Sequence, residues 1–238
     1  CSGRELSSLI RQIPEHVGLP IIFLSAETDK IKQTSLMTVG AEGFLTKPVQ
    51  PDDMISAVAI RAERMRLLRS LMVRDSLTGL FNHTFVAQFT ESALLDAQRV
   101  PDSKMICFAM IDVDHFKKVN DIHGHPVGDQ VLLGLARLLQ QSLRNSDMVG
   151  RYGGEEFAVV LRCSAIEDAF KVIDKIRTDF SNILFKSAQG EFTCTFSAGL
   201  ACYPGFDTGE TLRQEADQAL YAAKRGGRNR VVLGGSHP

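Results

Sequence analysis

Two clusters of carboxylates are the residues of this chain best suited to chemistry. Glu155-Glu156 follow a Gly-Gly pair directly, and Asp112-Val113-Asp114 follow the apolar run 105–111. The β-prone runs on both sides of Gly153-Gly154 predict a tight hairpin whose turn needs positive φ. If that hairpin and the run 105–111 are neighbouring strands, their carboxylates converge at one end of a sheet. Converging oxygen ligands suit Mg²⁺ carried by a nucleotide phosphate, whereas the alternative is an ordinary hairpin with a solvated acidic edge.

The composition is that of an ordinary globular protein, with 44% apolar and 23% charged residues in a chain of 238. The net charge of −1 gives no electrostatic reason to expect binding to nucleic acid or to an anionic membrane. No apolar run is long enough to span a membrane and no signal peptide opens the chain, so we expect a cytoplasmic protein.

The five cysteines are scattered and contain no Cys-x-x-Cys pair. Three of them lie in apolar, strand-like segments, which predicts buried free thiols in a reducing cytosol. They are Cys1, Cys107, Cys163, Cys194 and Cys202.

The elements that must position the carboxylates lie in residues 75–238. The run 105–111 is continuously apolar, which predicts a central strand covered on both faces. Around it we expect a helix to about residue 98, a helix over 126–143, a helix that starts at a capping box in 164–167, a half-exposed strand over 192–202, a helix over 210–224 and a strand over 229–233. The order β-α-α-β-β-α-β-α-β predicts an α+β domain with an antiparallel-rich sheet and helices on its faces, similar in outline to ferredoxin-like folds.

Residues 1–50 resemble the C-terminal half of a receiver domain of bacterial response regulators. The resemblance depends on Ser25-Ala26 after the apolar run 19–25, on Phe44, and on Lys47-Pro48 with an expected cis bond. It implies a partial α/β domain in which Ser25 and Lys47 hold a phosphoryl group on an aspartate that would precede Cys1. Half a receiver cannot bury both faces of its sheet, so we expect the chain to be a truncated or partly observed piece of a longer protein. The alternative is a generic β-α-β unit with a buried lysine.

Residues 51–74 predict a helical stalk. Pro51 suits a helix start, and Asp52 and Asp53 favour the dipole of the first turn. An apolar seam at spacings of four and three indicates pairing with a partner chain, although an arginine within it weakens that interpretation. The seam is Met54, Val58, Arg61, Met65, Leu68 and Met72. The alternative is a single amphipathic helix that lies on its own domain.

Residues 75–233 closely resemble the GGDEF family of bacterial diguanylate cyclases, in the GGEEF form of the signature. The motifs that carry the resemblance are Asp75-x-Leu-Thr-Gly-Leu-x-Asn82, the run Asp112 to Asp121, Gly124-His125-x-x-Gly128-Asp129, Arg151-Tyr-Gly-Gly-Glu-Glu-Phe157, Ser197-x-Gly199, Ala216-Asp217-x-Ala-Leu-Tyr221-x-Ala-Lys224 and Gly227-Arg228-Asn229-Arg230. The resemblance implies an enzyme that condenses two GTP molecules into cyclic di-GMP and releases two pyrophosphates. It also implies regulation by the receiver, an upstream sensor kinase, and inhibition by the product.

The resemblance implies a role for each matching residue. Metal ligands would be Asp112, the Val113 carbonyl, Glu155 and Glu156, holding Mg²⁺ or Mn²⁺. Glu155 would also accept the proton of the attacking 3′-hydroxyl, a task that Glu156 would share if one carboxylate cannot do both. Lys117 would stabilise charge on the phosphates.

The substrate and product contacts are implied in the same way. Asn120 and Asp129 would read guanine, because an amide and a carboxylate match its edge. Backbone N–H groups at His115-Phe116, with Lys224 and Arg228, would bind phosphates. The inhibitory site for the product would contain Arg144, Asp147 and, where the family usually has arginine, Lys175. Lysine lacks the flat fork of arginine, so inhibition would be weaker.

Three hypotheses follow. The first is an active cyclase, which must be a homodimer because one set of ligands holds one GTP. The second is a degenerate domain that binds nucleotide or cyclic di-GMP as a signalling module. The third is a cyclase for another nucleotide. It is disfavoured by the presence of Asn120 and Asp129, which would read guanine.

Overall fold

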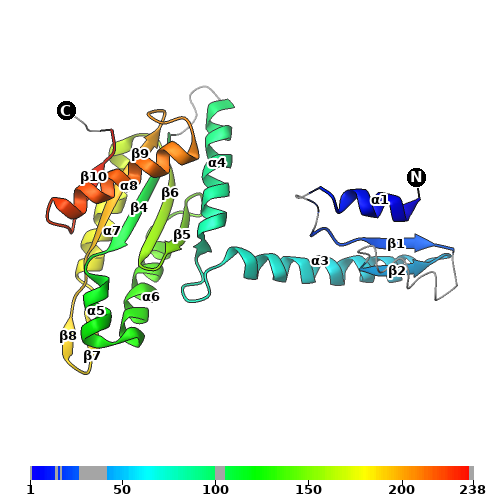
Figure 1. The fold of residues 1–238 in the computed structure, drawn as a ribbon, viewed down its shortest axis with the longest axis horizontal. Coiled ribbons are helices and arrows are strands. Elements are labelled where there is room, and N and C mark those ends of the chain that lie inside the picture. The colour runs from blue at the N-terminus through cyan, green and yellow to red at the C-terminus, as the bar shows by residue number, and fades with distance from the viewer. Residues whose placement is uncertain (1, 14–15, 17, 27–41, 100–104, 236–238) are drawn as a thin grey trace. The chain divides into compact units, whose positions relative to one another are not determined.

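The computed structural model describes residues 2–13, 16, 18–26, 42–99 and 105–235 (Figure 1). The chain divides into two compact units, residues 1–72 and 73–238, and each is described by itself. Among the described helices, none is long and apolar enough to cross a membrane.

The first unit contains the receiver-like piece. Helix α1 (Gly3–Ile10) is followed by the parallel strands β1 (Ile22–Ser25) and β2 (Gly43–Thr46). Ser25 pairs with Thr46 in the register of the two strands, and Lys47 directly follows β2. The Lys47–Pro48 bond is cis, as predicted.

Helix α3 (Pro51–Val73) begins at the predicted proline. Met54, Val58 and Leu68 of the expected seam are exposed, at 46%, 53% and 44%. Arg61, the polar member of the seam, instead donates from Nε and Nη2 to the Glu42 carbonyl at 3.0 and 2.8 Å. This arginine therefore faces the receiver-like piece of its own chain. Met72 belongs to a segment whose side chains lie outside the described ones.

The second unit is built on a six-stranded sheet with the order β10-β9-β4-β6-β5-β3. The central neighbours β9-β4-β6-β5 are antiparallel, and the two edge pairings are parallel, which confirms the antiparallel-rich α+β fold. The strands are β3 (Phe81–Asn82), β4 (Met105–Val113), β5 (Met148–Gly153), β6 (Glu156–Cys163), β9 (Phe196–Tyr203) and β10 (Val231–Leu233). A separate hairpin, β7 (Phe185–Ser187) and β8 (Gly190–Phe192), was not predicted.

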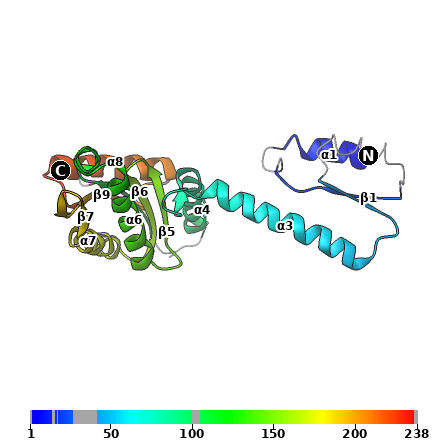
Figure 2. The same ribbon diagram turned by 90° about the horizontal axis from the view of Figure 1, so that it is seen from below.

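Helices cover both faces of this sheet (Figure 2). Ile106, Phe108 and Met110 of β4 pack in the core with α4 (His83–Arg99) and α8 (Gly209–Arg225). The alternate β4 residues, from Cys107 to Val113, pack in the core with α6 (His125–Ser142) and α7 (Ile166–Ser181). This burial on both faces confirms the prediction for run 105–111. A strand in that position places its last residues at the rim of the sheet.

Three local predictions were wrong. Strand β9 is buried over Phe196–Cys202 rather than half-exposed, because α8 covers one face and α7 the other. Helix α7 has Ala165 at its N-cap without a side-chain hydrogen bond, so the capping box at 164–167 does not form. The glycines of the Gly153-Gly154 turn do not have positive φ, because a register shift between Arg151 and Gly153 lets the chain turn without it.

The expectation of free thiols was wrong for two cysteines. Cys107 and Cys202 lie opposite each other on β4 and β9 and form a disulfide. Cys163 and Cys194 are free, and Cys163 Sγ lies 3.4 Å from Cys107 Sγ. Sequence spacing gave no sign of this pair, because 95 residues separate the two cysteines and only strand register brings them together.

Candidate active site

The two predicted carboxylate clusters meet at one end of the β4–β6 pair. Asp112 lies opposite Glu156 in the antiparallel register. One residue further on, the Val113 N–H donates to the Glu155 carbonyl at 3.3 Å. The pairing of β4 with β6 thus brings Asp112, Glu155 and Glu156 to the same rim, as the sequence predicted.

The three carboxylates share a region of concentrated negative charge. Asp112 is 6% exposed, and burial raises its pKa, although Lys224 opposes that shift. Burial and repulsion by Asp112 also raise the pKa of Glu155 and of Glu156. Each of these acids therefore carries its negative charge at a free-energy penalty that a bound cation would relieve.

Two cationic residues face this acidic rim. Lys224 Nζ lies 2.8 Å from Asp112 Oδ2 and comes from the last turn of α8. The Arg228 guanidinium is close enough to lower the pKa of Asp112. Lys224 therefore already contacts one oxygen of the Asp112 carboxylate. Within the described part of the chain, no three His, Cys, Asp or Glu side chains are gathered as a ready metal cluster.

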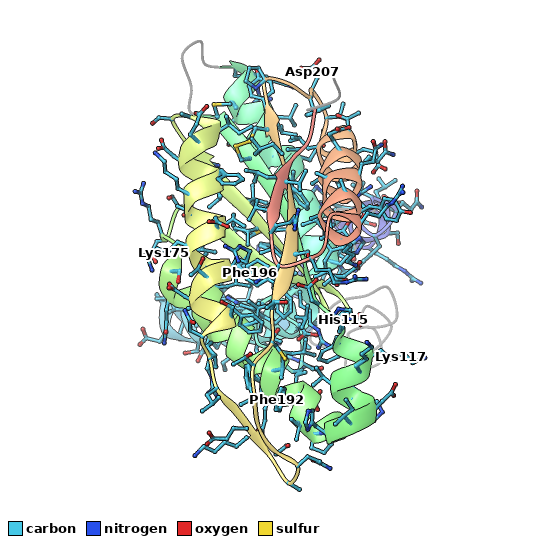
Figure 3. The ribbon with its side chains drawn as sticks, turned by 90° about the vertical axis from the view of Figure 1, so that its left-hand side faces the viewer. His115, Lys117, Lys175, Phe192, Phe196 and Asp207 are labelled. Atoms are coloured by element: carbon cyan, nitrogen blue, oxygen red, sulfur yellow. A yellow bond between two sulfur atoms is a disulfide. The ribbon has the colours of Figure 1, made fainter. Side chains whose placement is uncertain are left out.

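Helix α5 (Phe116–His123) carries the predicted substrate residues. Its N-cap, His115, has a left-handed backbone with φ of 59°, and Lys117 is exposed (Figure 3). Asn120 Oδ1 is buried and has no hydrogen-bond partner in the described structure. It points at Gly128 of α6, where any side chain would collide with it. An acceptor left without a donor makes this amide a candidate for contact with a ligand. Asp129 is exposed beside it on α6.

Asp75 and Arg151 form a clamp on the hairpin turn that sequence analysis did not identify. Arg151 Nη1 lies 3.2 Å from Asp75 Oδ1, and both side chains are largely buried. The same guanidinium donates from Nε and Nη2 to the Gly154 carbonyl at 2.9 and 2.7 Å. The clamp therefore fixes the residue immediately before Glu155. Asp75 begins the motif that ends at Asn82, and Arg151 begins the motif that ends at Phe157. Membership of these motifs was the one signal in the sequence that could have identified the pair.

Asp114 follows Asp112 in the same acidic cluster of the sequence, but its surroundings are different. It is only 5% exposed. Thr195 Oγ1 and Ser197 Oγ each donate to its carboxylate at 2.7 Å. It lies two residues after Asp112 without joining the acidic rim.

The predicted product site is only partly assembled. A pocket of about 420 Å³ is lined by Arg144 and Asp147, together with Arg162 and Lys171. Lys175 does not line it: the Lys175 ammonium lies 2.5 Å from Asp179 Oδ2 on the exposed side of α7. Lys175 and Lys117 are labelled on opposite sides of the domain in Figure 3.

The chain matches two known families. Residues 72–230 match the family described as diguanylate cyclase, GGDEF domain, and residues 1–59 match the response regulator receiver domain. The response regulator PleD of Caulobacter vibrioides is 32% identical over 243 residues, which cover 97% of this chain and 53% of PleD. The diguanylate cyclase DgcP of Pseudomonas aeruginosa is 37% identical over 165 residues, which cover 69% of this chain and 24% of DgcP. The chain thus spans about half of PleD and a quarter of DgcP.

A solved structure has the same fold. The coiled coil and GGDEF domain of DgcB from Caulobacter crescentus, in complex with c-di-GMP, is 33% identical and superposes with a TM-score of 0.70. The similarity covers 76% of this chain and 96% of that one.

Proposed function

Because this chain belongs to the GGDEF family of diguanylate cyclases, we propose that it condenses two GTP molecules into cyclic di-GMP and releases two pyrophosphates. The observation that carries the proposal is the convergence of Asp112, Glu155 and Glu156 with Lys224 at one end of β4 and β6. An acidic rim beside cationic side chains suits a triphosphate that arrives with a metal. Since GTP is the substrate, the proposed location is the cytoplasm.

The acidic rim fits a divalent cation, Mg²⁺ or Mn²⁺. Asp112, the Val113 carbonyl, Glu155 and Glu156 would hold it, because their crowded carboxylates have raised pKa values and Asp112 already contacts an ammonium. When bound, the cation supplies charge neutralisation to the triphosphate.

Glu155 is the proposed acceptor of the 3′-hydroxyl proton. Its raised pKa makes it a stronger base than an ordinary carboxylate, which favours proton transfer near neutral pH. The Arg151 clamp holds the residue before it, so the base is presented from a fixed turn. Glu156 shares the rim and is the second candidate for this role.

The remaining contacts would orient the nucleotide. Asn120 and Asp129 would read guanine, and the orphan oxygen of Asn120 supports that assignment. Lys117, Lys224 and Arg228, together with the backbone N–H groups at 115–116, would bind the phosphates.

Assembly as a homodimer follows from the stoichiometry. One site of this size and ligand set holds one GTP, whereas the product needs two, so two domains must face each other in a symmetric pair. The exposed apolar residues of α3, Met54, Val58 and Leu68 among them, would hold the second copy at high local concentration. The DgcB structure contains a coiled coil beside its GGDEF domain, which supports a helical pairing element here.

Regulation is proposed at two sites. The receiver-like unit, with Ser25 and Lys47, would respond to phosphorylation by an upstream sensor kinase, as the name of PleD as a response regulator suggests. The pocket beside Arg144 and Asp147 would bind the product, which the c-di-GMP complex of DgcB supports. Lys171, which lines the pocket, is a stronger candidate for the third contact than Lys175.

One assay tests the central proposal. The purified chain is incubated with GTP and Mg²⁺, and pyrophosphate and cyclic di-GMP are quantified beside the Glu155→Gln variant. Product from the wild type and none from the variant would support the proposal. Tight GTP or cyclic di-GMP binding without turnover would instead identify a binding module.

A further inference from the structure

Asp114 is a buried carboxylate whose hydrogen-bonding capacity is almost fully used. Its Oδ1 accepts from Ser197 Oγ at 2.7 Å. Its Oδ2 accepts from Thr195 Oγ1 at 2.7 Å and from the backbone N–H of Asn229 at 3.0 Å. A carboxylate offers about four lone-pair sites, so these three donors leave little capacity for a metal or a proton in transit.

The three donors come from two places that are distant in the sequence. Thr195 and Ser197 lie at the start of β9, where Ser197 is directly opposite Asp112. Asn229 lies in the turn between α8 and β10, directly after Arg228. Asp114 therefore ties the acidic end of β4 to the turn that carries a phosphate-binding arginine.

That turn has an unusual backbone. Arg228 and Asn229 have φ values of 63° and 45°, and neither is glycine. The left-handed conformation is unfavourable for a residue such as Arg228, less so for asparagine, and persists where surrounding contacts fix it. The contacts here are the Arg228 N–H to the Ala223 carbonyl at 3.0 Å, Arg177 Nη1 to Asn229 Oδ1 at 2.7 Å, and the Asn229 N–H to Asp114. Of these three contacts, the last is the one that reaches the end of β4.

We infer that Asp114 is a positioning residue, which holds the Arg228–Asn229 turn so that the Arg228 guanidinium faces the phosphates of the nucleotide at Asp112. The inference rests on the proposed function, since it assumes a nucleotide at this rim. Asp114 acts through Arg228 and does not touch the substrate.

A double-mutant cycle separates this role from a general contribution to stability. The affinity of the full chain for a non-hydrolysable GTP analogue with Mg²⁺ is measured for Asp114→Ala, Arg228→Ala and the double variant. Each single change should weaken binding roughly tenfold, as expected for a lost hydrogen bond to a charged group. The double variant should be no weaker than either single one, because both changes remove the same contact.

Two comparisons make the cycle specific. Lys117→Ala, on α5, should combine additively with Asp114→Ala, because Lys117 makes no contact with this network among the described residues. Asp114→Asn should recover most of the lost affinity, since its oxygen can accept from Thr195 and Asn229 while its amide donates to Ser197.

The outcomes are distinct. Additive effects of Asp114→Ala and Arg228→Ala, or equal coupling to Lys117, would overturn the inference. If Asp114→Ala does not fold, Thr195→Val removes one donor from the same oxygen and enters the same cycle. Because the readout is binding, a chain that binds the analogue but makes no cyclic di-GMP would refute the proposed function and leave this cycle interpretable.

Discussion

Replacing Lys224 by methionine should strengthen the binding of a divalent cation to the nucleotide-free protein. Lys224 Nζ lies 2.8 Å from Asp112 Oδ2, and the Asp112 side chain is 8% exposed. A cation that binds Asp112 through Oδ2 must first displace this ammonium. Methionine keeps most of the aliphatic side chain and removes only the competitor, so the acidic rim is left with its charge unpaired.

The size of the effect follows from the contact. A hydrogen bond between charged groups contributes about 1.5–3 kcal/mol, and the lower end applies here because Lys224 is 32% exposed. A difference of about 1.4 kcal/mol corresponds to a tenfold change in affinity. We therefore expect Lys224→Met to bind Mn²⁺ alone roughly ten times more tightly than the wild type. Its affinity for GTP should fall, because the same ammonium is needed by the phosphates.

The assay is Mn²⁺ titration of the nucleotide-free full chain, followed by electron paramagnetic resonance, with thermal unfolding to confirm the fold. Lys117→Met is the matched control, because Lys117 is exposed and has no ion pair with a described residue. It should weaken GTP binding without changing Mn²⁺ affinity. A folded Lys224→Met protein with wild-type or weaker Mn²⁺ affinity would refute the competition between lysine and metal.

Four further predictions test other parts of the molecule. Glu155→Gln should abolish turnover, because the proposed base is lost. Burial and the Asp112 charge raise the folded-state pKa of Glu155, so its ionised form destabilises the fold at neutral pH, and this variant should melt at a slightly higher temperature than the wild type without metal. Because the pKa of Glu155 is raised, the wild-type rate should begin to fall on acidification at a pH above the range in which ordinary carboxyl groups titrate. A wild-type turnover rate in the Glu155→Gln variant, or a wild-type rate that stays constant down to about pH 4.5, would remove Glu155 from the mechanism. Arg151→Ala should slow turnover about ten- to a hundredfold in initial-rate assays, whereas Asp75→Asn, which keeps one acceptor, should slow it less; equal rates would show that the clamp is dispensable. Arg144→Ala should relieve inhibition by added cyclic di-GMP with a nearly unchanged initial rate, unless the pocket does not bind the product. Val58→Glu should shift the rise of specific activity to higher protein concentration without changing its plateau, and identical curves with identical sedimentation would exclude α3 pairing.

The central strand could be predicted from the sequence, and so could the meeting of the carboxylates, on the condition that the two strands are neighbours. The uninterrupted apolar run 105–111 can only be satisfied by cover on both faces, and two acidic clusters at the ends of adjacent strands must share a rim. The helix that begins at Pro51 could be predicted equally well, because its start signal and its periodicity are local features of the sequence. The candidate site residues were identified from motifs at fixed spacings. Such motifs give the positions of residues along the chain, but they do not show which side chains contact one another.

The interaction partners of those residues could not be predicted, because they depend on how distant segments pack together. Asp114 is buried rather than solvated because Thr195, Ser197 and Asn229 reach it from segments that lie more than 80 residues away, as separations of 81, 83 and 115 show. Cys107 meets Cys202 for the same reason, since register across β4 and β9 is not visible in spacing. Lys175 lies on the exposed side of α7 and contacts Asp179. The rotation of α7 about its own axis on the sheet determines which of its side chains face the solvent. Local patterns determine which elements form and which faces they bury, whereas the partner of a polar side chain depends on the packing of distant elements.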